Sequence, residues 1–224
     1  CWRPAASSGT TIVQNTITDP LDEGLVSHWK MDEGQGIIAA DSVGGNDLSF
    51  HNTPTWADNG PTGSSSININ GVNDDGLFVN TLFGSPPQGT IGMWVNSQAL
   101  NTSGNAYFIE AGSSVSISDG AAGPGFTWYD GSTWTTITSN HEILGKGWHY
   151  ITATFDDPNN IMRFYIDGVL YAESTAATTI NYGAFGTMTT FGYKNGDATR
   201  TMDGGLDDIR IYNRALSPAE VKQL

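Results

Sequence analysis

Ten of the 23 acidic residues of this sequence occur as five adjacent pairs, and that spacing limits the chemistry that the pairs can support. Hydrolysis of a glycosidic bond uses two carboxylates that face each other about 5–9.5 Å apart. On one β-strand this requires acids at positions i and i+2 or i+4, because adjacent side chains point to opposite faces. The pairs are Asp22-Glu23, Asp32-Glu33, Asp74-Asp75, Asp156-Asp157 and Asp207-Asp208. We therefore predict no catalytic dyad within a strand, and acid partners from distant strands stay open.

Other catalytic motifs are missing from the sequence as well. It contains no G-x-S-x-G elbow, no H-E-x-x-H helix motif and no phosphate-binding G-x-x-x-x-G-K-[ST] loop. The four histidines have no spacing typical of metal ligands; they are His28, His51, His141 and His149. The sequence predicts a protein that is not an enzyme, and we assign no catalytic residue.

The stretch from Asp41 to Asp47 combines oxygen ligands with a flexible backbone. Its sequence, DSVGGND, holds two carboxylates, the amide of Asn46 and two glycines within seven residues. Ca²⁺ binds six to eight oxygens, backbone carbonyls included, although the spacing here is not that of an EF-hand. Asp and Asn also hold turns through local side-chain hydrogen bonds. The segment alone leaves a calcium loop and a hydrogen-bonded turn equally open.

Aromatic residues on either side of Asp130-Gly131 are candidates for carbohydrate contact. Exposed aromatic faces can pack against the C–H surfaces of sugars, with amides and carboxylates binding the hydroxyls. Trp128, Tyr129 and Trp134 lie in this segment, and strand alternation places Trp128 and Tyr129 on opposite faces. At least one of them can therefore face solvent. Packing of these rings in the core or across a hairpin is the competing interpretation.

The elements that must position these residues are short strands. Alternating apolar and polar runs recur between Gly, Asn, Asp and Pro clusters, with no helical period between them, which predicts an all-β sandwich or jelly roll. Asp130-Gly131 and Asp167-Gly168 are each typical of a two-residue type I′ hairpin turn. Ser217 to Glu220 predicts a short C-terminal helical turn with a capping box. The predicted strands cover 25–31, 48–50, 66–70, 77–79, 90–96, 106–110, 115–118, 125–129, 133–138, 148–155, 162–166, 169–174, 188–192 and 206–213.

Composition limits the partners of this 224-residue chain. Nine Lys and Arg stand against 23 Asp and Glu, giving a formal net charge of -14. A nucleic-acid partner requires clustered basic residues, which are absent, so we predict none. No apolar run approaches the ~20 residues of a transmembrane helix. We divide the chain into an extension or linker over residues 1–22 and one domain over residues 23–224. The single cysteine, Cys1, is a possible lipid anchor or simply the point at which the sequence begins.

Three segments resemble LamG-like jelly-roll domains of the concanavalin A-like lectin/glucanase superfamily. They occur in the expected order along the chain and together cover it from about residue 24 to residue 224. The resemblance is carried by LVSHWKMDEGQG with DSVGGND (25–36 and 41–47), by WHYI…FD…RFYIDG (148–168) and by GLDDIRIYNRALS (205–217). Val43 departs from the usual turn of the family. The acidic E-x-D-x-x-E strand motif of the catalytic members is absent.

The resemblance implies a two-sheet antiparallel sandwich whose first and last strands are neighbours. That arrangement would bring the Asp41–Asp47 loop near Asp207, where related jelly rolls hold a structural Ca²⁺. We therefore expect Ca²⁺ with Asp41 and Asp207 as side-chain ligands, and Asn46 and Asp47 as further ones. Asp208 is expected to bond loop backbone.

The function expected from these observations is binding. We predict a noncatalytic, calcium-stabilised module of a secreted or surface protein that binds polysaccharide or glycoprotein glycans. Its expected location is extracellular or on the cell surface, and a lipoprotein is one form that would place it there. An alternative is a structural or adhesive subunit that self-assembles through residues 1–22. A polysaccharide-cleaving enzyme with acids from distant strands is the least favoured reading.

Overall fold

The structure, a computed structural model, describes residues 19–61, 65–73, 75–80, 82, 84, 86–100, 103–176, 179–181 and 188–224. Cys1 and most of the predicted extension lie outside these residues, as do Asn101 and Thr102. Short strands dominate the fold, because β-branched and aromatic residues alternate with polar ones between turn residues. The strands are β1 (Leu25–Trp29), β2 (Ile38–Ala39), β3 (Leu48–His51), β4 (Thr55–Ala57), β5 (Ser66–Asn70), β6 (Gly76–Asn80), β7 (Gln88–Ala99), β8 (Asn105–Ala111), β9 (Val115–Gly120), β10 (Gly125–Tyr129), β11 (Trp134–Thr138), β12 (His149–Asp156), β13 (Ile161–Ile166), β14 (Val169–Ser174), β15 (Met188–Phe191) and β16 (Asp203–Tyr212).

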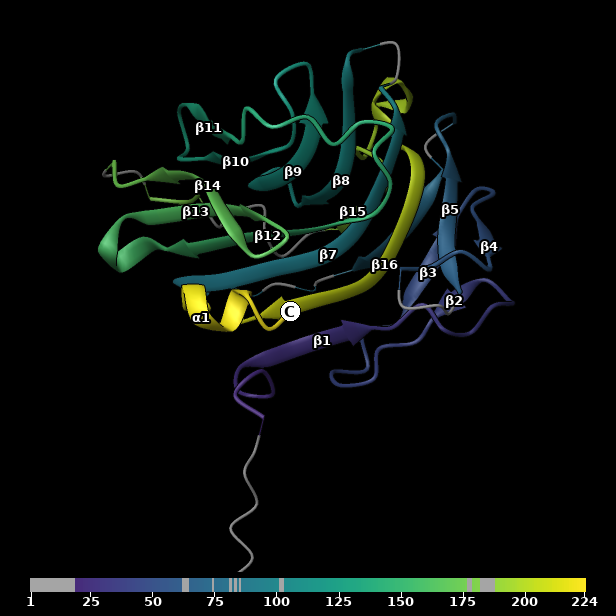
Figure 1. Cartoon of the computed structure of the whole chain (residues 1–224), viewed down its shortest axis with the longest axis horizontal. Coiled ribbons are helices and arrows are strands. Elements are labelled where there is room, and N and C mark those ends of the chain that lie inside the picture. The colour runs from purple at the N-terminus through teal and green to yellow at the C-terminus, as the bar shows by residue number, and fades with distance from the viewer. Residues whose placement is uncertain are drawn as a thin grey trace, which may run out of the picture.

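The strands form two antiparallel eight-stranded sheets packed face to face (Figure 1). Sheet A has the order β14-β13-β12-β7-β16-β5-β4, and β1 also pairs with β16. Sheet B has the order β11-β10-β9-β8-β15-β6-β3-β2. Edge strands β11 and β14 contact each other at one end of the sandwich. The predicted two-sheet jelly roll is confirmed.

Strand alternation fills the space between the sheets with apolar side chains. Ile91, Met93 and Val95 point inward from β7 and are fully buried. Aromatic contacts join the sheets: the Trp29 and Phe191 rings lie 5.5 Å apart between centroids. This core is continuous. It needs no disulfide, since a domain of this size can bury roughly 70% of the surface of its unfolded chain.

The predicted turns are confirmed in part. Asp167 and Gly168 have φ of 50° and 72°, and Ile166 pairs with Val169, which is the predicted two-residue hairpin. The prediction for Asp130-Gly131 is wrong, because Tyr129 pairs with Trp134 and four residues form the loop. The Asp130 carboxylate accepts from the backbone N–H groups of residues 132 and 133 and so stabilises this longer turn. Two short strands, β2 and β4, were not predicted.

The C-terminal turn forms as predicted. Helix α1 (Pro218–Val221) begins after Ser217, whose hydroxyl accepts from the Glu220 N–H, while the Glu220 side chain accepts from the Ser217 N–H. These two bonds are the capping box. Val221 packs with Leu21, Tyr165, Tyr212 and Leu216 in a second, smaller apolar cluster on the outer face of sheet A. Leu21, from the end of the predicted extension, therefore contacts the domain.

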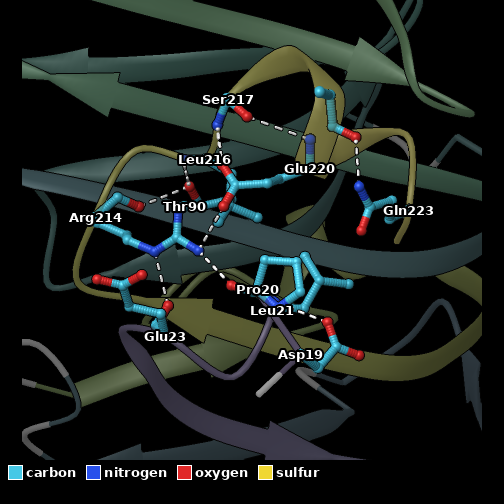
Figure 2. A network of polar contacts seen from close by, with 11 residues as sticks. Asp19, Pro20, Leu21, Glu23, Thr90, Arg214, Leu216, Ser217, Glu220 and Gln223 are labelled. Carbon is cyan, nitrogen blue, oxygen red and sulfur yellow. Dashed lines mark hydrogen bonds and ion pairs between the residues drawn. The ribbon is translucent and has the colours of Figure 1, made fainter. Parts of the chain in front are cut away.

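Arg214 links the segment before β1 to sheet A and to α1 (Figure 2). Its guanidinium donates to the carbonyls of Pro20 and Glu23, both at 2.7 Å, and forms an ion pair with Glu220 at 2.8 Å. Its own carbonyl accepts from the Thr90 hydroxyl on β7. One side chain thus binds the entering segment, the central strand of sheet A and α1.

We expect Arg214→Lys to lower the free energy of unfolding by about 1–3 kcal/mol, because one ammonium cannot reproduce the bonds of a guanidinium fork. Urea midpoints measure the loss. Arg163→Lys is the matched control, since the side chains of the Arg163–Glu173 pair are partly exposed and surface pairs contribute about 0–1 kcal/mol. Equal effects of the two substitutions would contradict the assigned role of Arg214.

The hydrogen bonds of Arg214 also make the stability of the fold depend on pH. The hydrogen bond from Arg214 lowers the pKa of Glu220 to about 2 from 4.5, against the effect of burial. A lowered carboxyl pKa stabilises the fold above the unfolded value of 4.5, and the contribution is lost as the pH falls toward about 2.

Candidate functional site

A polar groove crosses the outer face of sheet B. It has a volume of about 330 Å³ and runs over strands β8 to β11, with one end formed by the segment after β15. Its lining residues are Asn105, Tyr107, Glu110, Ser116, Ser118, Thr127, Trp134, Thr136, Lys194 and Arg200. A second hollow shares Asn105, Ser118 and Thr136 with it and continues to the loop at residues 120–125. The two form one extended depression.

Strand register arranges the hydroxyl groups of the groove in a row. Thr136, Thr127, Ser116 and Glu110 are successive cross-strand partners on β11, β10, β9 and β8. The Thr127 and Thr136 hydroxyls lie 2.8 Å apart and share a hydrogen bond. The row lies on the outer face of sheet B, where Thr127 and Thr136 are accessible to solvent and Ser116 and Glu110 are buried. It presents donors and acceptors at the spacing of neighbouring strands, about 4.8 Å.

One end of the groove is aromatic. Trp134 is 51% exposed, and its ring lies 4.9 Å from that of its cross-strand partner Tyr129. Both side chains lie on the outer face, as the alternation requires. The expectation that Trp128 contacts a ligand is wrong, because Trp128 points inward, is 0% exposed and packs against Phe126.

The other end of the groove is charged. The Lys194 ammonium and the Arg200 guanidinium both lie 5.8 Å from the centre of the Tyr107 ring. Arg200 also donates to the Tyr107 hydroxyl at 3.2 Å. Glu110 is 6% exposed and accepts from the Asn195 N–H at 3.0 Å. Burial raises the pKa of Glu110, while that N–H, Lys194 and Arg200 oppose the change.

This arrangement is suited to binding a polar chain. Hydroxyl rows, an amide and an exposed indole are the groups with which proteins contact sugars. Glycoside hydrolysis uses two carboxylates, and Glu110 is the one carboxylate among the groove-lining residues that the structure describes. The groove therefore offers recognition chemistry.

The predicted calcium loop is held together by Asp41. Its Oδ1 accepts from the His28 and Val43 N–H groups at 2.9 and 3.0 Å. Its Oδ2 accepts from the backbone N–H and the Nδ2 of Asn46 at 3.0 and 3.3 Å. Burial alone would raise the pKa of Asp41, but these donors lower it to about 2. A carboxylate has about four acceptor positions, so none is left for a cation in this arrangement.

Asn46 and Asp47 also take part in the loop. The Asn46 carbonyl accepts from the Trp29 indole N–H, and its Nδ2 donates to Ser27. Asp47 accepts from the Asp41 N–H at 2.9 Å. These hydrogen bonds are those of a hydrogen-bonded turn, one of the two interpretations of this segment, and the calcium interpretation stays a prediction. Among the described residues, the carboxylates of Asp41 and Asp47 make no hydrogen bond with Asp207. Strand β1 lies between Asp41 and β16.

Asp207 lies where β16 changes partners. Leu206 pairs with β5 and Ile209 pairs with β1, and the ladder with β7 is irregular between Asp207 and Arg210. Asp208 has a φ of 41° at this bulge. The Trp148 ring lies over neighbouring Gly205, where an added Cβ would be 2.5 Å from it. Asp207 is consequently buried on the outer face of sheet A.

The Asp207 carboxylate is only half satisfied. Its Oδ1 accepts from the Asp208 N–H at 2.8 Å, but its buried Oδ2 has no hydrogen-bond partner among the described residues. Burial raises its pKa to about 7 from 3.8, against that N–H, and the charges of Asp208 and Asp32 add to the effect. A buried acid among like charges is what a nearby cation would stabilise.

Asp208 bonds side chains instead of the loop backbone that we predicted. Its carboxylate binds His28 at 2.5 Å and Arg210 at 3.2 Å, which joins β1 to β16. Burial would raise the pKa of Asp208, but His28 and Arg210 lower it. Within the described ranges, no group of three or more His, Cys, Asp or Glu side chains is arranged to hold a metal.

Sequence reasoning missed most of the groove. Trp134 and Tyr129 were predicted, but Tyr107, Glu110 and Lys194 were not. The period-2 pattern of β8 and β9 contained a usable signal, because Ser116 and Ser118 alternate with buried Val115 and Ile117. Lys194 and Arg200 come from a turn 84 or more residues later than Glu110, and only the tertiary fold brings them together.

Comparisons with known proteins agree with this architecture. Residues 62–222 match the family model Laminin_G_3, described as the concanavalin A-like lectin/glucanases superfamily. No curated protein has a significantly matching sequence. None of the described helices is long and apolar enough to span a membrane.

Several solved structures share the fold. Domain 4 of AbnA, an extracellular arabinanase from Geobacillus stearothermophilus in complex with arabinotriose, is 21% identical with a TM-score of 0.71; the match covers 89% of this chain and 97% of that domain. The binding domain of Paraclostridial Mosquitocidal Protein 1 is 17% identical with a TM-score of 0.72, covering 91% of this chain and 52% of that one. The binding domain of Botulinum Neurotoxin DC, in complex with SialylT, is 16% identical with a TM-score of 0.68, covering 91% and 51%.

This chain thus spans about half the length of the toxin binding domains and nearly all of the arabinanase domain. At sequence identities this low, the structural similarity shows a shared fold and nothing more. The family match over most of the sequence shows that the chain belongs to the concanavalin A-like lectin/glucanase superfamily, in its Laminin_G_3 family.

Proposed function

We propose that this protein is a noncatalytic carbohydrate-binding module whose binding site is the groove on sheet B. The observation that carries the proposal is the combination of an exposed indole, Trp134, with a registered row of hydroxyl groups in one depression. A sugar ring would stack on Trp134, and its hydroxyls would exchange hydrogen bonds with Thr127 and Thr136. The natural target would be a polysaccharide or a glycoprotein glycan.

Two of the structural neighbours support this proposal. The arabinanase domain, which this chain matches over nearly its full length, is complexed with arabinotriose, and the neurotoxin domain is complexed with SialylT. Because the arabinanase is extracellular, we also propose a secreted or cell-surface location. The acidic, lysine-poor composition is compatible with that setting.

We expect Trp134→Ala to weaken glycan binding by roughly 30-fold, the effect of a residue contributing about 2 kcal/mol. A glycan array followed by isothermal titration calorimetry with the bound glycan measures it. Tyr171→Ala is the matched control, because Tyr171 is a partly exposed aromatic residue on β14 of the other sheet. The Tyr171→Ala variant should bind the glycan with the affinity of the wild type. Absence of binding to any glycan by correctly folded protein in calcium would refute the proposed function.

We further propose that a structural Ca²⁺ stabilises the module through Asp207. The fit is favourable there, because a buried carboxylate oxygen lacks a partner and Asp32 and Asp208 add negative charge nearby. Ca²⁺ would supply the missing positive charge and accept the free oxygen as a ligand. Asp41 does not fit the same role, since its acceptor positions are occupied by N–H donors. The ligand set is therefore proposed around Asp207 alone.

A further inference from the structure

The groove is lined by more basic than acidic residues, although the protein as a whole is acidic. The chain carries 23 acidic and nine basic residues, yet two of the groove-lining residues are basic and one is acidic. Both cations stand at the same end, beside the Tyr107 ring. The local composition is the reverse of the overall bias, and neutral-sugar recognition does not require it.

Lys194 differs from most of the basic residues in its pairing. Ion pairs engage the basic side chains at positions 146, 163, 200, 210 and 214. Among the residues that the structure describes, Lys194, Lys30 and Lys222 have none, and of these three only Lys194 lines the groove. Its ammonium carries three N–H donors. A ligand entering the groove therefore meets a charge that no protein carboxylate directly contacts.

Arg200 adds a second, more fixed cation. Asp197 binds its Nε at 3.0 Å, and Tyr107 accepts from its Nη1. The contact with Asp197 is an ion pair in which Nε makes no hydrogen bond, so the bond to Tyr107 uses one of the five N–H donors of the arginine. Asp197 is itself held by the Thr199 N–H and hydroxyl, at the start of η3 (Ala198–Arg200). The guanidinium is thus positioned at the rim with donors to spare.

The acidic groups near this end do not cancel its attraction for an anion. Glu110 lies at the floor, is almost fully buried and accepts from the Asn195 N–H. Burial raises the pKa of Glu110, while the Asn195 N–H, Lys194 and Arg200 oppose that change. The other acid at this end, Asp197, accepts from the Thr199 N–H and hydroxyl and pairs with Arg200. Lys194 and Arg200 are each partly exposed, whereas Glu110 is buried.

From this placement we propose that the groove selects acidic glycans, with the Lys194 ammonium and the Arg200 guanidinium binding a carboxylate or sulfate substituent while Trp134 stacks on a neighbouring sugar. The inference rests on the proposed carbohydrate-binding function and names its ligand class. Charge-assisted hydrogen bonds are the chemistry by which lysine and arginine recognise both anions.

Matched pairs of probes test this selectivity at about 0.15 M salt, where charges more than about 8 Å apart are largely screened. The carboxylate pair is tetragalacturonate and its methyl ester. The sulfate pair is a kappa-carrageenan tetrasaccharide and its desulfated form. We expect the acidic member of at least one pair to bind about tenfold more tightly than its neutral member, and the pair that responds identifies the anion.

Lys194→Met should remove that preference, so that the two members of the pair bind with equal affinity, whereas Trp134→Ala should weaken the binding of both members. Lys222→Met is the matched control, because Lys222 is an unpaired lysine outside the groove. Neutral glycans bound on an array with no preference in either pair, or a preference that survives Lys194→Met, would overturn this inference and leave the proposed function standing. No glycan bound at all would overturn both.

Discussion

Replacing Asp207 with asparagine is expected to stabilise the calcium-free protein at pH 8 by about 2–4 kcal/mol. Each pKa unit corresponds to about 1.4 kcal/mol, so the difference between 3.8 and about 7 corresponds to at most about 4 kcal/mol. Asparagine keeps the acceptor for the Asp208 N–H and removes the buried charge. The lower end of the range reflects the unpaired amide that it leaves in place of Oδ2.

The pH dependence follows from the same difference. The folded pKa of Asp207 is raised, so between about pH 4 and pH 7 the folded state holds a proton that the unfolded state has released. The stability of the calcium-free wild type should therefore fall as the pH rises through this window. The Asp207→Asn variant should lack this fall, and urea denaturation at pH 5 and pH 8 in EGTA measures it. Asp203→Asn, on the same strand and partly exposed, is the control.

Calcium should reduce the difference in stability between the two proteins. At a concentration of 100 Kd, one site on the folded state contributes about 2.7 kcal/mol. The wild type should gain this stability, and Asp207→Asn should gain little. If EGTA and calcium give the same wild-type melting temperature, the protein has no stabilising calcium site, and the pH dependence of Asp207 stands by itself.

The sandwich was predictable because its determinants are local. Alternation gives the inward face of strands such as β7, and Asp167-Gly168 supplies the positive φ angles of its turn. Asp130-Gly131 looks the same in sequence but forms a longer loop, because the Asp130 carboxylate bonds two N–H groups beyond the turn. A dipeptide does not determine that outcome. Strands β2 and β4 are too short for a period to be visible.

The site was less predictable, because it depends on register between distant strands. Trp134 could be identified from its own neighbourhood, but the choice between Trp128 and Tyr129 required knowing which face is the core. Lys194 and Arg200 reach Tyr107 only through the pairing of β15 with β8. In the same way, the burial of Asp207 depends on the order of the strands in sheet A, which its own neighbourhood in the sequence does not show.

Asp41 should behave differently from Asp207 in every one of these experiments. Asp41→Ala is expected to lower the free energy of unfolding by about 2–3 kcal/mol, because three backbone N–H groups, of His28, Val43 and Asn46, lose their acceptor in a partly buried loop. The loss should be the same in calcium and in EGTA. Asp41→Asn retains one carbonyl oxygen as an acceptor. Its free energy of unfolding should therefore lie between those of the wild type and Asp41→Ala. Asp58→Ala, an exposed residue of a nearby loop, is the control and should have little effect.

The contrast between the two acids separates a structural hydrogen-bond acceptor from a metal ligand. The pKa of Asp41 is lowered to about 2, so its contribution is present above pH 3.8 and is lost as the pH falls toward 2, the opposite of the dependence expected for Asp207. Calcium binding requires an oxygen that is free or easily freed, and of these two acids Asp207 is the one with a buried oxygen that has no hydrogen-bond partner among the described residues. If Asp41→Ala instead abolished the stabilisation by calcium, its N–H bonds would have to be exchanged for a cation. The loop would then be a calcium ligand after all.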